Sequence, residues 1–173
     1  MPAELAGGDS DRRRLRIYEH ILVPLDGSEL AETAIAHAET LARGCGAQSI
    51  TLLAVAGRSN GHRKVVDASG ETDEPAVPGS ASWKERDASS YITRMAFRLS
   101  ERGLPITYKL VIGDPAQAII HHAEHSPCEI IVMTGRARSG PGRLTLGSVA
   151  DKVIRASTVP VLIVGSRVTA HGE

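Results

Sequence analysis

The segment IIVMTGRARSGPGRLTLGS, residues 130–148, indicates the class of fold of this chain. It begins with a run of large apolar residues, which is typical of a buried strand in a parallel sheet. It ends in Gly147 and Ser148, which precede apolar residues at helical spacing, among them Val149 and Val153. A buried strand that leads through a glycine-rich loop into an amphipathic helix is the building unit of an α/β protein.

The same alternation of strand and helix extends outward from this segment. Apolar runs predict strands at 21–25, 50–55, 106–112, 130–133 and 160–164, and helical spacing predicts helices at 29–43, 83–102, 115–126 and from 148 onward. Such alternation implies parallel pairing and right-handed crossovers. We therefore predict an α/β fold with a single-domain, open, parallel five-stranded sheet, strand order 3-2-1-4-5 along the chain, and helices on both faces.

Three other segments lack this pattern. Residues 1–18 form a polar leader that we expect to be disordered, and residues 167–173 form a polar tail. Residues 56–82 carry glycine, proline and charge with few large apolar side chains, so we predict a long loop rather than a second domain. The predicted domain therefore spans residues 19–166.

Composition excludes several classes of function. The 173 residues carry a formal net charge of zero, which offers no general attraction to nucleic acid or to an anionic membrane. Aromatic residues make up 3%, too few for a surface that stacks single-stranded bases. We found neither an apolar run of membrane-spanning length nor a signal peptide, so we expect a cytoplasmic protein. Cys45 and Cys128 are expected to be reduced structural thiols.

The loop at 134–148 is the first candidate for a binding site. It offers glycines for close backbone approach, three arginines for positive charge, and hydroxyls: Gly135, Gly140, Gly142, Gly147, Arg136, Arg138, Arg143, Ser139, Thr145 and Ser148. These groups precede a helix N-terminus, whose unpaired N–H groups favour an anion such as phosphate. An alternative needs no ligand, because Ser148 and Asp151 also fit a helix-capping box.

Asp26 follows the first predicted strand in the sequence Asp26-Gly27-Ser28. In the order 3-2-1-4-5 the strand order reverses between strands one and four, so their carboxyl ends meet at the usual ligand position. A carboxylate there can accept hydrogen bonds from ribose hydroxyls, beside the phosphate loop. The combination indicates a nucleotide, although Asp26 alone is also explained as a turn residue.

Four stretches now carry a resemblance to a known family. They are ILVPLDGSELAETAIAHA at 21–38, GDPAQAII at 113–120, EIIVMTGRARSG at 129–140 and RLTLGSVADKVIRASTVPVLIV at 143–164. The chain resembles the universal stress protein family from His20 to Ser166, except at 56–82. The nucleotide-binding branch of that family carries Gly-x-x-Gly, nine residues, then Gly-Ser or Gly-Thr. Counting back from Gly147, the two earlier glycines are replaced by Thr134 and Ala137.

The resemblance implies a bound adenine nucleotide, most simply ATP, with or without Mg²⁺. It assigns the ribose to Asp26, the border of the adenine to Pro24 and the backbone of Ile50, and the phosphates to the residues around Gly147. The predicted nucleotide-binding residues are Pro24, Leu25, Asp26, Ile50, Met133, Thr134, Gly135, Ala137, Arg138, Gly140, Gly147, Ser148 and Val149.

The resemblance further implies a homodimer formed through the last strand, Pro160–Val164, and a regulatory protein as partner. We expect a stress-response or signalling module; a slow ATPase and a dimeric stress protein without nucleotide are the alternatives. No catalytic residue is predicted, because the 134–148 loop lacks a base and a metal-holding carboxylate. His121 and His125 have the spacing of two metal ligands but no evident third, which favours a solvated helix face.

Overall fold

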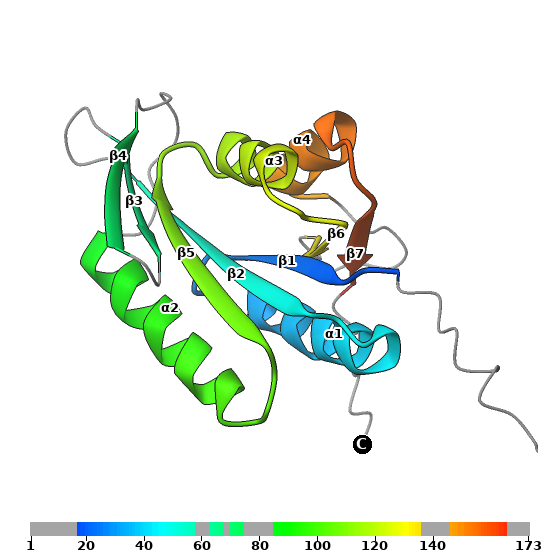
Figure 1. Cartoon of the computed structure of the whole chain (residues 1–173). Coiled ribbons are helices and arrows are strands. Elements are labelled where there is room, and N and C mark those ends of the chain that lie inside the picture. Colours follow the sequence, from blue (N-terminus) through cyan, green and yellow to red (C-terminus); the bar gives the residue numbers. More distant parts are fainter. Residues whose placement is uncertain (1–16, 58–62, 68–69, 75–84, 136–145, 166–173) are drawn as a thin grey trace, which may run out of the picture.

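The computed structural model describes residues 17–57, 63–67, 70–74, 85–135 and 146–165. Strands and helices alternate along most of the chain (Figure 1). The elements are β1 (His20–Leu25), α1 (Glu29–Cys45), β2 (Ser49–Ala56), β3 (Arg63–Asp67), β4 (Gly70–Glu74), α2 (Glu85–Ser100), β5 (Ile106–Ile112), α3 (Pro115–His125), β6 (Ile130–Thr134), α4 (Ser148–Ala156) and β7 (Val161–Val164).

One sheet runs through the molecule in the order β4-β3-β5-β2-β1-β6-β7. The five strands β5, β2, β1, β6 and β7 are parallel, and their order is the predicted 3-2-1-4-5. The fold prediction is therefore confirmed. β1 lies at the centre and pairs with β2 on one side, Ile21 opposite Ile50, and with β6 on the other, Ile21 opposite Ile130.

The strands β3 and β4 differ from the loop predicted at 56–82. They pair with each other in antiparallel fashion, and β3 pairs antiparallel with β5, where Val65 lies opposite Val111. The hairpin thus adds two strands beside β5, which would otherwise be an edge of the parallel sheet. Edge strands offer unpaired backbone groups, and pairing them does not require large apolar side chains. For that reason the composition of the segment did not reveal these strands.

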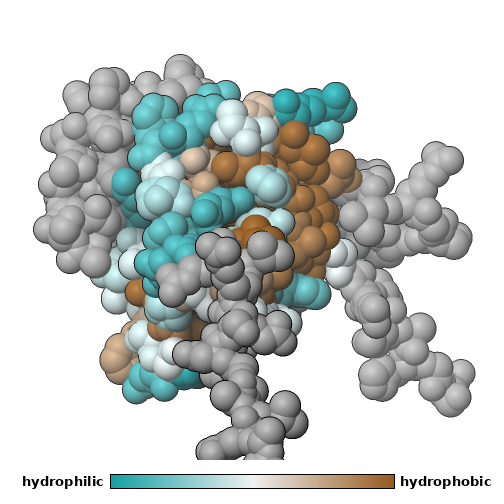
Figure 2. Space-filling model, turned by 45° about the vertical axis from the view of Figure 1, so that its right-hand side comes forward, coloured by the Kyte–Doolittle hydropathy of each residue, from teal (hydrophilic) through white to brown (hydrophobic). Residues whose placement is uncertain are grey.

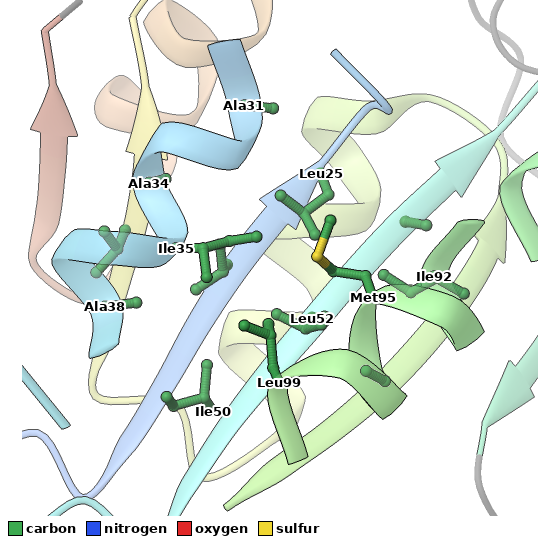
Figure 3. Packing of buried hydrophobic residues seen from close by; sticks show 14 of the residues in the cluster. Leu25, Ala31, Ala34, Ile35, Ala38, Ile50, Leu52, Ile92, Met95 and Leu99 are labelled. Atoms are coloured by element: carbon green, nitrogen blue, oxygen red, sulfur yellow. The ribbon is translucent and has the colours of Figure 1, made fainter. Parts of the chain in front are cut away.

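The sheet is covered on both faces, as predicted, by α1 and α2 on one side and α3 and α4 on the other (Figure 1). Successive residues of β2 point to opposite faces: Leu52 packs under α1 and α2 beside Met95 and Leu99, as Figure 3 shows, while Leu53 packs under α3. Both leucines have no exposed surface. Burial of each contributes roughly 1.5–3 kcal/mol to folding.

Within the described residues, no helix combines the length and the apolar character that crossing a bilayer requires.

Candidate functional site

A cavity of about 450 Å³ lies at the carboxyl edge of the sheet. Its walls come from the ends of β1, β2 and β6 and from the first turns of α1, α3 and α4. The lining residues are Pro24, Leu25, Asp26, Ser28, Leu30, Ala31, Leu53, Val55, Pro115, Ile119, Met133, Thr134, Gly147, Ser148, Val149 and Ala150. From β1 the chain runs outward to β2 and β5 on one side, and it then returns through α3 to β6 on the other side of β1. The cavity therefore lies where the strand order reverses.

Eight of the predicted site residues line this cavity: Pro24, Leu25, Asp26, Met133, Thr134, Gly147, Ser148 and Val149. The end of β1 and the two described ends of the 134–148 segment therefore lie at the same cavity, as sequence analysis expected. Gly135 is buried just beyond β6, where its N–H donates to the carbonyl oxygen of Val164 at 3.2 Å, and it does not line the cavity. Ala137, Arg138 and Gly140 lie outside the described residues.

Ile50 is the predicted site residue that the structure places elsewhere. It lies near the amino end of β2, where its N–H donates to the carbonyl oxygen of Pro105 at 2.8 Å. Its side chain belongs to the core under α1 and α2 (Figure 3). The strand contributes Leu53 and Val55 to the cavity instead. Ile50 was assigned through the family resemblance, although the first residue of the strand predicted at 50–55 lies at the edge opposite the carboxyl ends of a parallel sheet.

Several other lining residues were missed by sequence analysis, for example Ile119. This side chain comes from α3, which crosses over the sheet between β5 and β6, and it faces the same cavity as Met133. Such contacts arise from a crossover helix and have no local sequence signal. Together with Leu53 and Val55 these side chains give the cavity an apolar wall, a common feature of small-molecule sites.

Asp26 serves both as a turn residue and as part of the cavity wall. Gly27 has φ +79°, a left-handed conformation that glycine adopts without strain. The turn brings Ser28 back to the Asp26 carboxylate: Oδ1 accepts from the Ser28 N–H at 3.0 Å and from the Ser28 hydroxyl at 2.6 Å. Ser28 also caps α1, because its Oγ accepts from the N–H of Ala31 at 3.1 Å.

The first turn of α4 lacks a side-chain cap. Gly147 is the N-cap residue, with φ −67° and ψ 158°, and Ser148 is the first helical residue. The predicted capping box of Ser148 and Asp151 was therefore wrong by one position. Asp151 instead pairs with Arg155 at 3.0 Å, and this hydrogen bond lowers the pKa of the Asp151 carboxyl. Ser148 and Val149 line the cavity, and among the described residues no side chain accepts a hydrogen bond from the N–H groups at the start of α4.

Close to Asp26, a polar cluster joins α1 and α2, the two helices that cover the same face of the sheet. The Tyr91 hydroxyl of α2 donates to Glu32 of α1 at 3.0 Å, and Arg98 lies 3.5 Å from the same carboxylate. Burial raises the pKa of Tyr91, and the hydrogen bond to Glu32 and the negative charges of Glu32 and Asp26 raise it further. Tyr91 therefore stays a neutral donor at physiological pH.

Two of the three histidines of α3 form a stacked pair. The rings of His121 and His125 lie 4.1 Å apart at an angle of 15°, and Nδ1 of His125 lies 2.9 Å from the carbonyl oxygen of His121. In the part of the chain that the structure describes, no three His, Cys, Asp or Glu side chains converge as metal ligands would.

The parallel strands, with an apolar cavity, a carboxylate and a helix N-terminus at the switch point, define an open α/β protein whose cavity lies at the usual ligand position of such sheets. The sequence profile of the universal stress protein family matches residues 17–165. The chain belongs to the universal stress protein family.

Among curated relatives, universal stress protein MJ0531 of Methanocaldococcus jannaschii is 28% identical over 154 residues, which cover 86% of this chain and 82% of that protein. Universal stress protein YxiE of Bacillus subtilis is 29% identical over 153 residues, covering 86% of this chain and 99% of YxiE.

Solved structures share the fold. The protein MJ0577, studied for structure-based assignment of its biochemical function, superposes with a TM-score of 0.63 at 24% identity, covering 88% of this chain and 99% of its own. A universal stress protein in complex with cAMP has a TM-score of 0.58 at 22% identity, covering 85% of this chain and 97% of its own. At these identities the likeness establishes the fold.

Proposed function

We propose that this protein binds an adenine nucleotide, ATP in the first instance, in the cavity at the carboxyl edge of the sheet. We further propose that it works in the cytoplasm as a stress-response or signalling module whose nucleotide state is read by a regulatory protein. One observation carries the proposal: a single cavity of about 450 Å³ is bordered by the Asp26 carboxylate and by the uncapped start of α4. Small-molecule sites typically have volumes of about 300–1,000 Å³.

The two polar borders match the two polar parts of a nucleotide. A carboxylate accepts hydrogen bonds from the 2′- and 3′-hydroxyls of ribose, and Asp26 supplies one. The start of α4 supplies N–H donors at Ser148 and Val149 together with the positive end of the helix dipole, which favour phosphate. The Ser148 hydroxyl, which does not cap the helix, adds a further donor.

The base is assigned to the apolar part of the cavity, where Val55, Ile119 and Met133 offer apolar contact for a purine ring. Magnesium fits this scheme as a companion of the phosphates, because Mg²⁺ usually binds through phosphate oxygens and water with one or two carboxylates. The solved cAMP complex of a family member with the same fold is consistent with an adenine-containing ligand.

Binding is tested first on the purified protein. The protein is denatured, any released nucleotide is identified by chromatography, and thermal unfolding is followed with ATP, ADP, AMP and cyclic AMP. A ligand at 100 times its Kd stabilises the folded state by about 2.7 kcal/mol. Absence of both a released nucleotide and a thermal shift would refute the proposal and leave a stress protein without nucleotide. Steady release of ADP that is lost in Asp26→Ala would identify a slow ATPase instead.

Asp26→Asn separates the ligand role of Asp26 from its turn role. The amide oxygen can still accept from Ser28, so the turn is retained, while the amide nitrogen cannot accept from ribose. We expect ATP binding to weaken about tenfold or more, with the thermal stability of the unliganded protein nearly unchanged. Equal affinity in Asp26→Asn and the parent protein would remove Asp26 from the site.

We also propose that β7 forms the homodimer interface. It is the last strand of the sheet in the described residues and pairs only with β6. Leu162 on β7 is 37% exposed and Ile154 on α4 is 40% exposed. Figure 2, which brings this side of the molecule forward, shows hydrophobic surface gathered there. An apolar edge strand of this kind gains from pairing with another strand.

Sedimentation velocity tests the interface. Leu162→Asp is expected to shift the protein to monomer, because a buried, unpaired carboxylate opposes association. Phe97→Asp is the matched control: Phe97 is 64% exposed on α2, in the opposite helical layer, and its replacement should leave the dimer intact. A parent protein that sediments as a monomer, or a Leu162→Asp variant that remains a dimer, would contradict the assignment.

A further inference from the structure

The Asp26 carboxylate is held through one of its two oxygens. Oδ1 accepts two hydrogen bonds from Ser28, one from the backbone N–H at 3.0 Å and one from the hydroxyl at 2.6 Å. A carboxylate oxygen offers about two acceptor positions, so these bonds occupy Oδ1. Among the described residues no hydrogen bond to Oδ2 is present, and Asp26 is exposed and lines the cavity.

The direction of the Ser28 hydroxyl proton is set by α1. A hydroxyl has one proton to donate, and the Ser28 Oγ already accepts from the N–H of Ala31 at 3.1 Å. Its proton is therefore directed at Asp26, because the 2.6 Å contact with an acceptor-only carboxylate requires a donor. The result is a chain of hydrogen bonds from the first turn of α1 through Ser28 to Asp26, which fixes the rotation of the carboxylate.

We propose that Ser28 is a positioning residue for the nucleotide: by occupying Oδ1 of Asp26 it presents Oδ2 to the two hydroxyls of ribose and makes the site selective for ribonucleotides over 2′-deoxyribonucleotides. This inference rests on the proposed nucleotide binding, which it deepens by naming the class of sugar. Ser28 itself acts through Asp26 and through the cap of α1.

The selectivity follows from the number of acceptor positions that remain. With Oδ1 occupied, Oδ2 has two positions left, one for each hydroxyl of a cis-diol. A 2′-deoxyribose fills only one of them. A site built to bind a hydroxyl of its ligand discriminates strongly against an analogue without that hydroxyl, because a polar group of the site is then left without a hydrogen-bond partner. Without the Ser28 hydroxyl the carboxylate can rotate, and both oxygens compete for a single sugar hydroxyl.

The test compares ATP with 2′-deoxyATP by titration calorimetry on the parent protein and on Ser28→Ala, Ser28→Gly and Ser28→Thr. The parent protein is expected to prefer ATP by about tenfold, as a hydrogen bond to a charged group implies. In Ser28→Ala we expect ATP to bind about tenfold more weakly and the preference over 2′-deoxyATP to fall to about twofold or less. Ser28→Thr, which retains a hydroxyl, should restore both the affinity and the preference.

Ser28→Gly controls for the loss of the helix cap. Glycine is a tolerable N-cap residue and alanine a poor one, so the glycine variant should be the more stable of the two. Both lack the hydroxyl, and the proposal expects both to lose the preference for ATP equally. If Ser28 had a purely structural role, the loss of the preference for ATP would instead follow the loss of folding stability. The more stable glycine variant would then keep a preference close to that of the parent protein. That result would overturn the positioning role.

Two outcomes separate this inference from the proposed function. If the parent protein binds ATP and Ser28→Ala or Ser28→Gly keeps the full preference over 2′-deoxyATP, the role of Ser28 is refuted while nucleotide binding stands. If the parent protein binds neither nucleotide, both proposals fall together.

Discussion

The helices α3 and α4 begin at the same cavity, but their N-termini are capped differently. At α3, Asp114 accepts from the N–H of Gln117 at 3.0 Å, and Pro115 occupies the position where an N–H would have no partner. At α4, the N-cap is Gly147, which has no side chain to offer. Residues of both turns line the cavity.

The difference shows where the chain completes its own hydrogen bonding and where it leaves donors for a ligand. The α3 start is satisfied internally, and Asp114 additionally lies 3.9 Å from Lys152 of α4. The α4 start keeps its donors at the edge of a cavity. Free N–H groups at a helix N-terminus are costly to bury and favourable toward an anion. We therefore regard α3 as a structural wall of the site and α4 as its binding end.

The largest expected effect comes from giving α4 the kind of cap that α3 has. Gly147→Asp introduces no backbone strain, because φ is −67°. The new carboxylate should stabilise the unliganded protein by only a few tenths of a kcal/mol, because glycine is itself a tolerable N-cap. It should also weaken ATP binding by about a hundredfold or more through repulsion of the phosphates. Thermal unfolding and titration calorimetry measure the two opposite changes. Gly147→Ser, a neutral cap, is the control, and unchanged ATP affinity in Gly147→Asp would place the phosphates elsewhere.

Removing the phosphates from the ligand, instead of changing the protein, also tests the role of the α4 N-terminus. Adenosine should bind about tenfold or more weakly than ATP, because it cannot use the N–H groups of Ser148 and Val149. Added salt should weaken ATP binding but hardly affect adenosine. Adenosine should also bind Gly147→Asp and the parent protein equally well. Equal affinities for ATP and adenosine in the parent protein would show that the α4 start contributes nothing.

A smaller effect is expected from removing the cap of α3. Asp114→Ala leaves the N–H of Gln117 without its acceptor and should lower the free energy of unfolding by about 1 kcal/mol. Chemical denaturation measures this loss. ATP affinity should change by less than about twofold, since α3 is assigned a structural role. A large loss of affinity in a folded Asp114→Ala variant would contradict that division of roles between the helices.

At neutral pH the smallest effect is expected from the titration of Cys128, beyond the far end of α3, because this effect appears only at high pH. Burial raises the pKa of this thiol from 9.0 to about 11. The folded state therefore keeps a proton that the unfolded state has lost, and this stabilisation is complete below pH 9 and disappears as pH rises through about 11. In denaturation experiments the stability difference between the parent protein and Cys128→Ala should narrow over that interval. A constant difference would show that burial does not perturb the thiol.

Much of the fold was predictable because its signals are local. The apolar run at Ile106–Ile112 was predicted with the bounds that β5 has, and the sequence Gly113-Asp114-Pro115 marked the start of α3 correctly. Continuous apolar strands joined by amphipathic helices leave few arrangements other than a parallel sheet. The β3–β4 hairpin escaped prediction because backbone pairing to β5 stabilises it without an apolar pattern.

The candidate site was predicted only in outline. Asp26 and Ser148 were expected to meet because parallel strands end at one edge of the sheet, and both line the cavity. Ile50 was placed at the site through the family resemblance, whereas it lies near the amino end of β2, away from the carboxyl edge. The alternative explanation of Ser148 as the cap of α4 was wrong, because Gly147 is the N-cap and Ser148 is the first residue of the helix.

The sequence by itself determined the family, the order of the parallel strands, and the two loops that carry a carboxylate and a helix start. These depend on residue type and spacing, which act over a few neighbouring positions. Only the tertiary structure decided that α4 keeps free N–H groups, that Ser28 occupies one oxygen of Asp26, and that Leu53 and Ile119 form an apolar wall. Those features depend on how strands and crossover helices from distant parts of the chain meet, and on hydrogen-bond directions that no local pattern specifies.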